Sequence, residues 1–277
     1  MSCDHENEKG NFINQPLYFK AEGAGKPAII MLHGMLGSHR YWDSVVPQLR
    51  KNHELILLDL LGFGKSPKPE IEYSVEQHAA KIDDIIDRTQ LKNDQSIIVG
   101  HSMGAFLALN YAIAHPEKVK KLILINAPMK TDEESLKKAI AESSSRFMVI
   151  MTFNKTWGKL ICKIHEMIPA IGYPLARIFE PDLPPAIAKA VGQHNYSSYV
   201  GTFENILLKQ NFYELLVKVS DIPVLIISSN QDEYTKAESL ELLPQRSTIK
   251  LVKIDGNHNV LLKAPDRISE EILKFIE

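Results

Sequence analysis

Short, fully apolar runs recur along this chain, at spacings that leave room for a helix between several of them. A run this short and this apolar is typical of a strand that is buried on both faces of a parallel sheet. Strands that alternate with helices favour right-handed crossovers and a doubly wound α/β sheet. The runs are residues 28–32, 55–58, 97–99, 122–125, 224–227 and the more alternating 249–254.

Helices can be predicted where start and stop signals are present. The sequence Ser74-Val75-Glu76-Gln77 has the capping-box pattern and opens a stretch with apolar residues on one face. Another helix should begin after Ser102 and end near Pro116, because proline cannot continue a helix. The last should begin around Pro265, since proline is favoured in a first helical turn. We expect helices of this kind to cover the sheet.

The alternation of strands and helices stops between residues 129 and about 210. No strand-like run occurs there, and prolines divide the stretch into several helical pieces. We therefore expect a helical cap over residues 129–210, between an N-terminal core of residues 1–128 and a C-terminal core of residues 211–277. Some large side chains of the cap are candidates for lining a substrate pocket, although packing onto the core is the more common role for any one of them: Phe147, Met151, Trp157 and Tyr199.

The sequence Gly100-His101-Ser102-Met103-Gly104 lies directly after an apolar run and directly before a helical pattern. This context is the one in which a nucleophile elbow occurs. The turn is so tight that the backbone approaches itself at both flanking positions, which glycine tolerates best. The pattern predicts that Ser102 is presented at the carboxyl edge of the sheet as a nucleophile, beside a helix N-terminus that favours developing negative charge.

A serine needs a base to remove its proton, and an imidazole titrates near neutral pH. His258 follows the last strand-like run, so its loop should reach the same sheet edge as Ser102. A buried acid must hold that imidazole in one tautomer. Asp232 follows the run 224–227, and Glu233 is its nearest rival. The order Ser, acid, His is the one that this elbow motif requires.

A tetrahedral intermediate also needs two backbone N–H donors directed at its oxyanion. One should be the N–H of Met103, immediately after the nucleophile. The second should come from the loop of residues 33–37 after the first apolar run, and we assign it to Met35.

Together these motifs resemble the α/β-hydrolase superfamily, and the similarity extends from about Leu17 to Phe275. The resemblance implies a mostly parallel central sheet flanked by helices, with a helical cap inserted after the sixth strand, as in capped serine hydrolases. It also favours Asp232 over Glu233, because the family places an aspartate there. Haloalkane dehalogenases and related epoxide hydrolases use an aspartate nucleophile, so Ser102 argues against them.

Charge and composition narrow the range of partners. Lysine and arginine total 32 against 34 aspartate and glutamate residues, so no basic field attracts nucleic acid. The chain has two cysteines, which do not make a disulfide framework, and we expect no secretory signal. No apolar run is long enough to span a membrane. These observations together favour a cytoplasmic location. Cys162 and His165 form a single pair without further ligands, so we expect no metal site and no cofactor.

The expected activity is hydrolysis of carboxylic esters, or of thioesters, of small to medium acyl substrates through an acyl-enzyme intermediate. A carbon–carbon bond hydrolase of the same fold is an alternative, although those enzymes commonly carry a tryptophan after the catalytic histidine, where this chain has Asn259. A ligand-binding protein that kept the fold is another alternative, because this fold hosts receptors as well as enzymes.

Overall fold

The computed structural model describes residues 15–89, 91, 94–143, 145–179 and 183–277. Within them, the core is a seven-stranded sheet of order β1-β3-β2-β4-β5-β6-β7, in which only the β1–β3 pair is antiparallel. The strands are β1 (Phe19–Glu22), β2 (Ile29–Leu32), β3 (Leu55–Leu58), β4 (Ser96–His101), β5 (Val119–Ile125), β6 (Val224–Ser229) and β7 (Ile249–Ile254).

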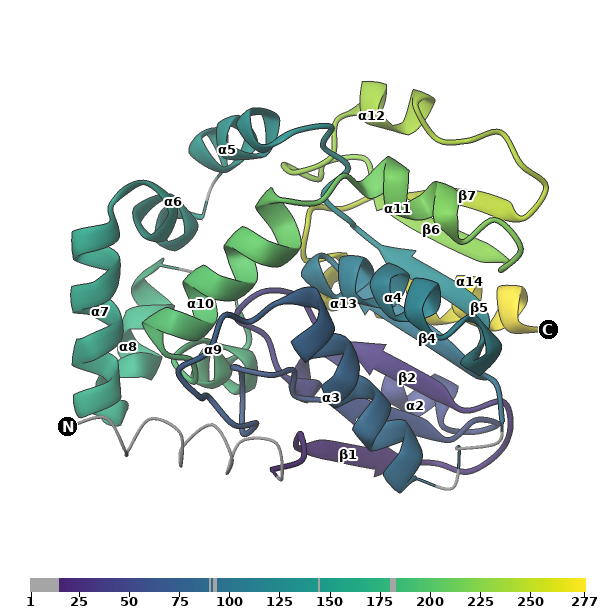
Figure 1. Ribbon diagram of the computed structural model, residues 1–277, viewed down its shortest axis with the longest axis horizontal. Coiled ribbons are helices and arrows are strands. Elements are labelled where there is room, and N and C mark those ends of the chain that lie inside the picture. The colour runs from purple at the N-terminus through teal and green to yellow at the C-terminus, as the bar shows by residue number, and fades with distance from the viewer. Residues whose placement is uncertain (1–14, 90, 92–93, 144, 180–182) are drawn as a thin grey trace.

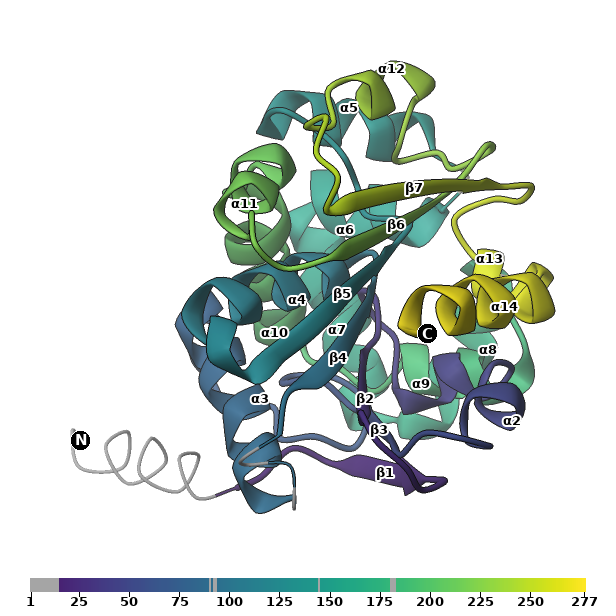
Figure 2. The ribbon, with the colours of Figure 1, turned by 90° about the vertical axis from the view of Figure 1, so that its right-hand side faces the viewer.

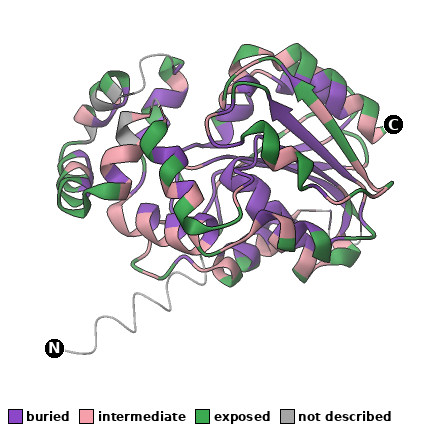
Figure 3. Cartoon of the chain, turned by 90° about the horizontal axis from the view of Figure 1, so that it is seen from above, coloured by how far each residue is buried: buried purple, intermediate pink, exposed green. Residues whose placement is uncertain are grey.

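The apolar runs of the sequence are confirmed as strands β2 to β7. Strands β2, β3, β4 and β6 are buried along their whole length, which is why they carry no aspartate, glutamate, lysine or arginine. Figure 3 shows these strands as the buried centre of the molecule. Strand β1 was not predicted, because its sequence Phe-Lys-Ala-Glu lies at a partly exposed edge and lacks an apolar run.

Helices cover both faces of the sheet, as Figure 2 shows. One face carries α3 (Val75–Arg88), α4 (Met103–Ala114) and α11 (Phe212–Lys218), and the other carries α2 (Val46–Leu49), α13 (Val260–Lys263) and α14 (Pro265–Ile276). The predicted capping box is confirmed, since Gln77 N–H donates to Ser74 Oγ and Ser74 N–H donates to Gln77 Oε1. Short helical turns complete the core: η1 (His39–Trp42), η2 (Pro116–Lys118) and α12 (Ala237–Glu241).

The described residues between β5 and α11 form a group of helices at one end of the sheet (Figure 1). They are α5 (Glu133–Glu142), α6 (Arg146–Phe153), α7 (Lys155–Met167), α8 (Pro169–Phe179), α9 (Pro185–Val191), α10 (Tyr196–Thr202) and the π-helix η3 (Phe203–Leu208). This insertion follows β5, the fifth described strand, whereas we expected it after a sixth. The domain boundaries at residues 129 and 210 stay a prediction.

No helix in the described part of the chain combines the length and the apolar character that a membrane crossing requires.

Candidate active site

Ser102 lies in a strained turn between β4 and α4. Its backbone has φ +55° and ψ −118°, a conformation that side-chain-bearing residues rarely adopt. The two flanking glycines make this turn possible. A Cβ on Gly100 would lie 2.2 Å from the carbonyl oxygen of Gly104, and a Cβ on Gly104 would lie 2.1 Å from that of Leu32. Both positions therefore exclude every residue larger than glycine.

The structure brings Ser102, His258 and Asp232 into one hydrogen-bonded chain. His258 Nε2 lies 2.9 Å from Ser102 Oγ, and His258 Nδ1 lies 3.0 Å from Asp232 Oδ1. Because an ionised carboxylate only accepts hydrogen bonds, Nδ1 carries the proton and Nε2 offers its lone pair to the serine hydroxyl. The Asp232 side chain is fully buried, while that of His258 is 18% exposed. Glu233, the rival acid, lines the neighbouring cavity instead.

These residues meet because they follow the carboxyl ends of three strands of the sheet. Ser102 follows β4, Asp232 follows β6 and His258 follows β7, and all three strands run parallel. Parallel strands bring their carboxyl ends to one edge, where the sites of open α/β sheets lie.

Two residues without a predicted role hold the loop that carries His258. His101 Nε2 donates to the carbonyl oxygen of His258 at 3.0 Å, and Asn126 Nδ2 donates to the same oxygen at 3.1 Å. Burial keeps the pKa of His101 well below its ordinary value, and the nearby His258 lowers it further. Asn126 also has φ +45° and bonds Ser229 through both ends of its amide. Its position directly after a buried strand is the sequence signal that points to it.

The two expected oxyanion donors belong to segments next to Ser102, because Met103 directly follows it and a Cβ on Gly34 would lie 3.1 Å from Ser102 Cβ. Met103 is the first residue of α4, where a helix leaves the N–H groups of its first turn without an intrahelical partner. Met35 lies in a turn closed by a hydrogen bond from Gly37 N–H to Gly34 O at 3.1 Å. Met35 and Ser102 both line the cavity described below.

His33 fixes the loop that carries Met35. Its Nδ1 donates to Gly34 O at 2.7 Å, and its Nε2 accepts from Leu60 N–H at 3.0 Å. Full burial lowers the pKa of His33 to about 4, so the ring is neutral at pH 7 and can make one bond of each kind. The sequence predicted an oxyanion loop here but no partner for His33, because Leu60 lies on a distant loop.

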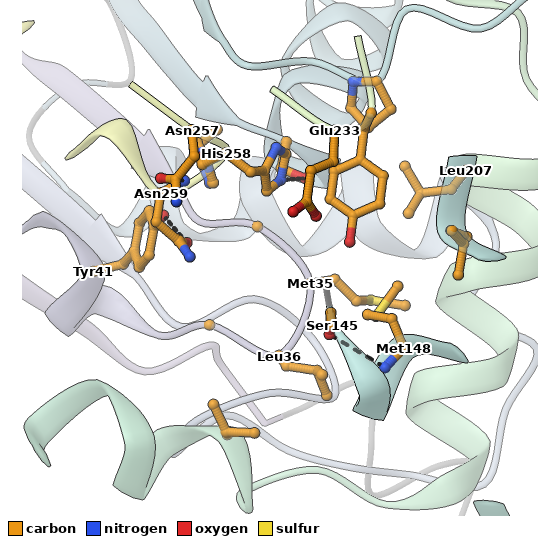
Figure 4. A pocket seen from close by; sticks show the side chains of 18 of the residues that line it. Met35, Leu36, Tyr41, Ser145, Met148, Leu207, Glu233, Asn257, His258 and Asn259 are labelled. Atoms are coloured by element: carbon orange, nitrogen blue, oxygen red, sulfur yellow. Dashed lines mark hydrogen bonds between the residues drawn. The ribbon is translucent and has the colours of Figure 1, made fainter. Parts of the chain in front are cut away.

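A cavity of about 1100 Å³, including its open mouth, lies over Ser102. Figure 4 shows Tyr41, Asn257, His258 and Asn259 on one side of it and Met148 and Leu207 on the other. Most of its polar groups gather around Ser102 and His258, whereas the far wall is apolar apart from Ser145, which lies beside Met148. That wall comes from α5, α6, α9, η3 and the segment before α9: Leu136, Ile140, Met148, Leu183, Ile187, Val191, Phe203 and Leu207.

Of the four cap residues proposed to bind substrate, the three whose side chains are described do not line this cavity. Met151 and Tyr199 are buried and line a second cavity between α5, α6, α10 and η3. Trp157 is 57% exposed on α7. The side chain of Phe147 lies outside the described residues. The cap side chains that line the Ser102 cavity are mostly aliphatic, together with Phe203 and with Met148, which lies three residues before Met151 on α6.

Residues 27–265 match the family model described as the alpha/beta hydrolase fold. The matched region covers most of the chain and contains Ser102, Asp232 and His258. This chain therefore belongs to the alpha/beta hydrolase family.

Similar proteins differ in how much of the chain they match. An uncharacterized protein of Mycobacterium tuberculosis is 37% identical over 109 residues, which are 39% of this chain and 31% of that protein. The 2-hydroxy-6-oxo-6-(2'-aminophenyl)hexa-2,4-dienoic acid hydrolase of Metapseudomonas resinovorans is 36% identical over 38% of this chain and 37% of its own length. These alignments span about a third of each relative.

A longer alignment joins the chain to 1-acylglycerol-3-phosphate O-acyltransferase ABHD5 of Rattus norvegicus, at 24% identity over 98% of this chain and 84% of that protein. Among solved structures, a bromoperoxidase from Bacillus anthracis matches with a TM-score of 0.71 at 21% identity, covering 95% of this chain and 97% of its own. An esterase from Exiguobacterium antarcticum matches with a TM-score of 0.71 at 20% identity, covering 94% and 95%. At these identities the structural likeness shows the fold.

Proposed function

We propose that this chain is a serine hydrolase that cleaves carboxylic esters through an acyl-enzyme intermediate. The observation that carries the proposal is the hydrogen-bonded chain from Ser102 Oγ through His258 to the buried Asp232 carboxylate. This arrangement can remove the serine proton and hold the resulting imidazolium in place.

In the first half of the reaction, Ser102 Oγ attacks the ester carbonyl carbon while its proton passes to His258 Nε2. The carbonyl oxygen becomes an oxyanion and accepts hydrogen bonds from the N–H groups of Met103 and Met35. The imidazolium then protonates the leaving alcohol, and the carbon–oxygen bond breaks to give an ester on Ser102.

In the second half, a water molecule takes the place of the alcohol. His258 Nε2 removes a proton from this water as it attacks the acyl carbon, and the same proton later returns to Ser102 Oγ. The carboxylic acid is released and the enzyme regains its starting state. Asp232 stays ionised throughout and stabilises the imidazolium that forms twice in each cycle.

The cavity supports an acyl or alcohol group with an apolar body. Its far wall is largely aliphatic, with Met148 and Phe203 among its residues, and the one carboxylate among the lining residues, Glu233, lies near His258. Burial of a hydrocarbon chain against that wall stabilises the complex by roughly 0.8 kcal/mol for each methylene group removed from water. Thioesters fit the same machinery, because the step at the carbonyl carbon is unchanged.

Carbon–carbon bond hydrolysis is the second candidate, because the Metapseudomonas resinovorans relative is named as a hydrolase of a dienoic acid. The position after His258 is occupied by Asn259, whose Oδ1 accepts a hydrogen bond from Tyr41 OH at 2.8 Å. This pair puts two polar side chains beside the triad, where carbon–carbon hydrolases commonly have a tryptophan. Ester hydrolysis is therefore our first choice.

The test is hydrolysis of p-nitrophenyl esters of increasing acyl length by the wild type and by Ser102→Ala. We expect a rate in the wild type with an optimum in acyl length, and a rate at the background level in the variant. A fluorophosphonate probe should label the wild type once, at Ser102. If the two proteins are equally slow at every length, ester hydrolysis is refuted. Turnover of a vinylogous diketone would then favour carbon–carbon cleavage, and tight ligand binding without turnover would favour a binding protein.

A further inference from the structure

Three metal-ligating side chains meet inside the cap, and none of them lines the Ser102 cavity. Cys162 and His165 lie on one face of α7, and His194 lies just after α9. All three are buried, with exposed fractions of 0%, 4% and 3%. One ligand atom from each lies within 4.8 Å of the other two. The sequence showed Cys162 and His165 as a pair without partners, and folding supplies the third ligand.

The tautomer of His194 suits a ligand. Its Nδ1 lies 2.7 Å from the carbonyl oxygen of Val191, which can only accept, so Nδ1 carries the proton. Nε2 therefore has the lone pair, and it lies 3.5 Å from Cys162 Sγ. Histidines that bind metals are oriented in this way, with the second ring nitrogen donating to a carbonyl or a carboxylate.

The spacing of these two atoms also fits a shared metal ion. With a zinc–sulfur bond of about 2.3 Å and a zinc–nitrogen bond of about 2.1 Å, tetrahedral ligands lie about 3.6 Å apart. The observed 3.5 Å between Cys162 Sγ and His194 Nε2 matches this edge.

His165 is the second, independent sign of a ligand site. Its Nε2 is buried and has no hydrogen-bond partner among the described residues, which is costly for a polar atom. Its ring centroid lies 4.8 Å from that of His194, with the planes inclined at 47°. A bound cation would give this nitrogen a partner after a small closure of the cluster.

A nucleophilic cysteine–histidine dyad is the obvious competing role, and the surroundings argue against it. Burial raises the pKa of the Cys162 thiol to about 12 and lowers the pKa of His194 to about 3. Without a cation the pair is therefore neutral, and a neutral buried thiol is a poor nucleophile.

We propose that Cys162, His165 and His194 bind one Zn²⁺ ion in the cap, with water as a fourth ligand. A thiolate with two imidazoles is a ligand set that selects zinc or a related thiophilic cation such as Cu⁺ rather than Mg²⁺ or Ca²⁺. The ion would take the place of the thiol proton and would tie α7 to the end of α9.

The test uses the full chain without a histidine tag, treated with a chelator, loaded with ZnCl₂ and desalted. We expect about one zinc per chain in the wild type by atomic emission. Cys162→Ser, which is nearly isosteric, and His194→Gln should bind zinc at least about 100-fold more weakly, because losing even an outer partner of a metal ligand costs 10- to 100-fold. His115→Gln, which alters a described histidine outside the cluster, should bind as the wild type does.

Cobalt substitution gives a spectroscopic readout that depends on direct binding of the metal by Cys162, and a purely structural role of this cysteine would not produce it. Co²⁺ bound by a thiolate has a ligand-to-metal charge-transfer band, so this band should appear in the wild type and be absent in Cys162→Ser. Ester hydrolysis by each variant shows that it is folded. Substoichiometric zinc in the wild type, or equal zinc in Cys162→Ser, would overturn the proposal. Tight Cu⁺ uptake without zinc uptake would overturn the choice of ion.

Discussion

Replacing Asp232 with asparagine separates two effects of this carboxylate in the candidate triad. The carboxylate fixes the tautomer of His258, and its negative charge stabilises the imidazolium. In other triads this change lowers kcat by about 10⁴, because the amide stabilises the wrong tautomer of the histidine. In this protein, Asp232 Oδ1 accepts two hydrogen bonds, from His258 Nδ1–H at 3.0 Å and from Tyr234 N–H at 2.9 Å. An amide NH₂ group at that position would face the Tyr234 N–H donor.

The asparagine should therefore place its carbonyl oxygen where Oδ1 was. His258 then keeps the correct tautomer, and the NH₂ group takes the place of Oδ2, a buried atom without a hydrogen-bond partner in the described structure. What is lost is the negative charge beside the imidazolium. Hydrogen bonds to charged groups contribute roughly 1.5–3 kcal/mol, so we expect kcat to fall about 10²-fold rather than 10⁴-fold.

The assay is kcat for the best p-nitrophenyl ester, measured for Asp232→Asn, Asp232→Ala and a control, Asp255→Asn. Asp255 is an exposed carboxylate on the loop that carries His258, where it accepts a hydrogen bond from Asn230 Nδ2 at 2.6 Å. The control should stay within about twofold of the wild type, since an exposed polar contact contributes little. A loss near 10⁴ in Asp232→Asn would show that the amide turns its NH₂ group toward His258 and would refute this reasoning.

Three further changes test other parts of the structure. Gly104→Ala should lower the free energy of unfolding by about 3 kcal/mol or more in urea titrations, because the new Cβ lies 2.1 Å from Leu32 O. In the control Gly158→Ala the new Cβ meets its nearest atom at 3.2 Å, so the free energy of unfolding should change by less than about 1 kcal/mol. Equal effects of the two substitutions would contradict the close approach at the elbow. His33 has a folded-state pKa of about 4 against 6.5 in the unfolded chain, so the unfolded state binds more protons between these two pH values. As the pH falls from 6.5 to 4, this group should therefore remove about 1.4 kcal/mol of stability per pH unit. A urea midpoint that is independent of pH would contradict the burial of His33 as a neutral ring. Leu207→Trp should move the optimum of p-nitrophenyl ester hydrolysis to shorter acyl chains, because Leu207 lines the apolar wall; an unchanged optimum would show that the chain lies elsewhere.

The sequence predicted the sheet and the elbow because both depend on local patterns. A strand that is buried on both faces is rich in apolar residues, and the elbow admits only glycine where a Cβ would lie 2.1–2.2 Å from a backbone oxygen. Both patterns can be recognised in the local sequence, without knowledge of distant contacts. The candidate triad follows from the same logic, since its loops begin where the buried strands end. Asn126 and His33 were missed because their roles depend on partners that are distant in sequence.

The cap could not be predicted to the same depth, because its helices are apolar on more than one face. On α7, Cys162 and His165 face inward while Trp157 is exposed, and a pattern of large side chains does not tell these faces apart. The four aromatic and methionine candidates were chosen by size. The cavity is instead lined by other residues of α5, α6, α9 and η3, which come together only in the folded chain.

The candidate metal site and the candidate active site share α9. Val191 accepts the hydrogen bond that orients His194, and the same residue lines the cavity over Ser102. An ion held by Cys162, His165 and His194 would therefore restrain one wall of the cavity over Ser102, because Val191 lies three residues before His194 and is hydrogen-bonded to it. If that restraint is real, zinc should sharpen the acyl-length profile of the wild type and leave that of Cys162→Ser unchanged. If both profiles respond equally, zinc acts on ester hydrolysis through another part of the chain.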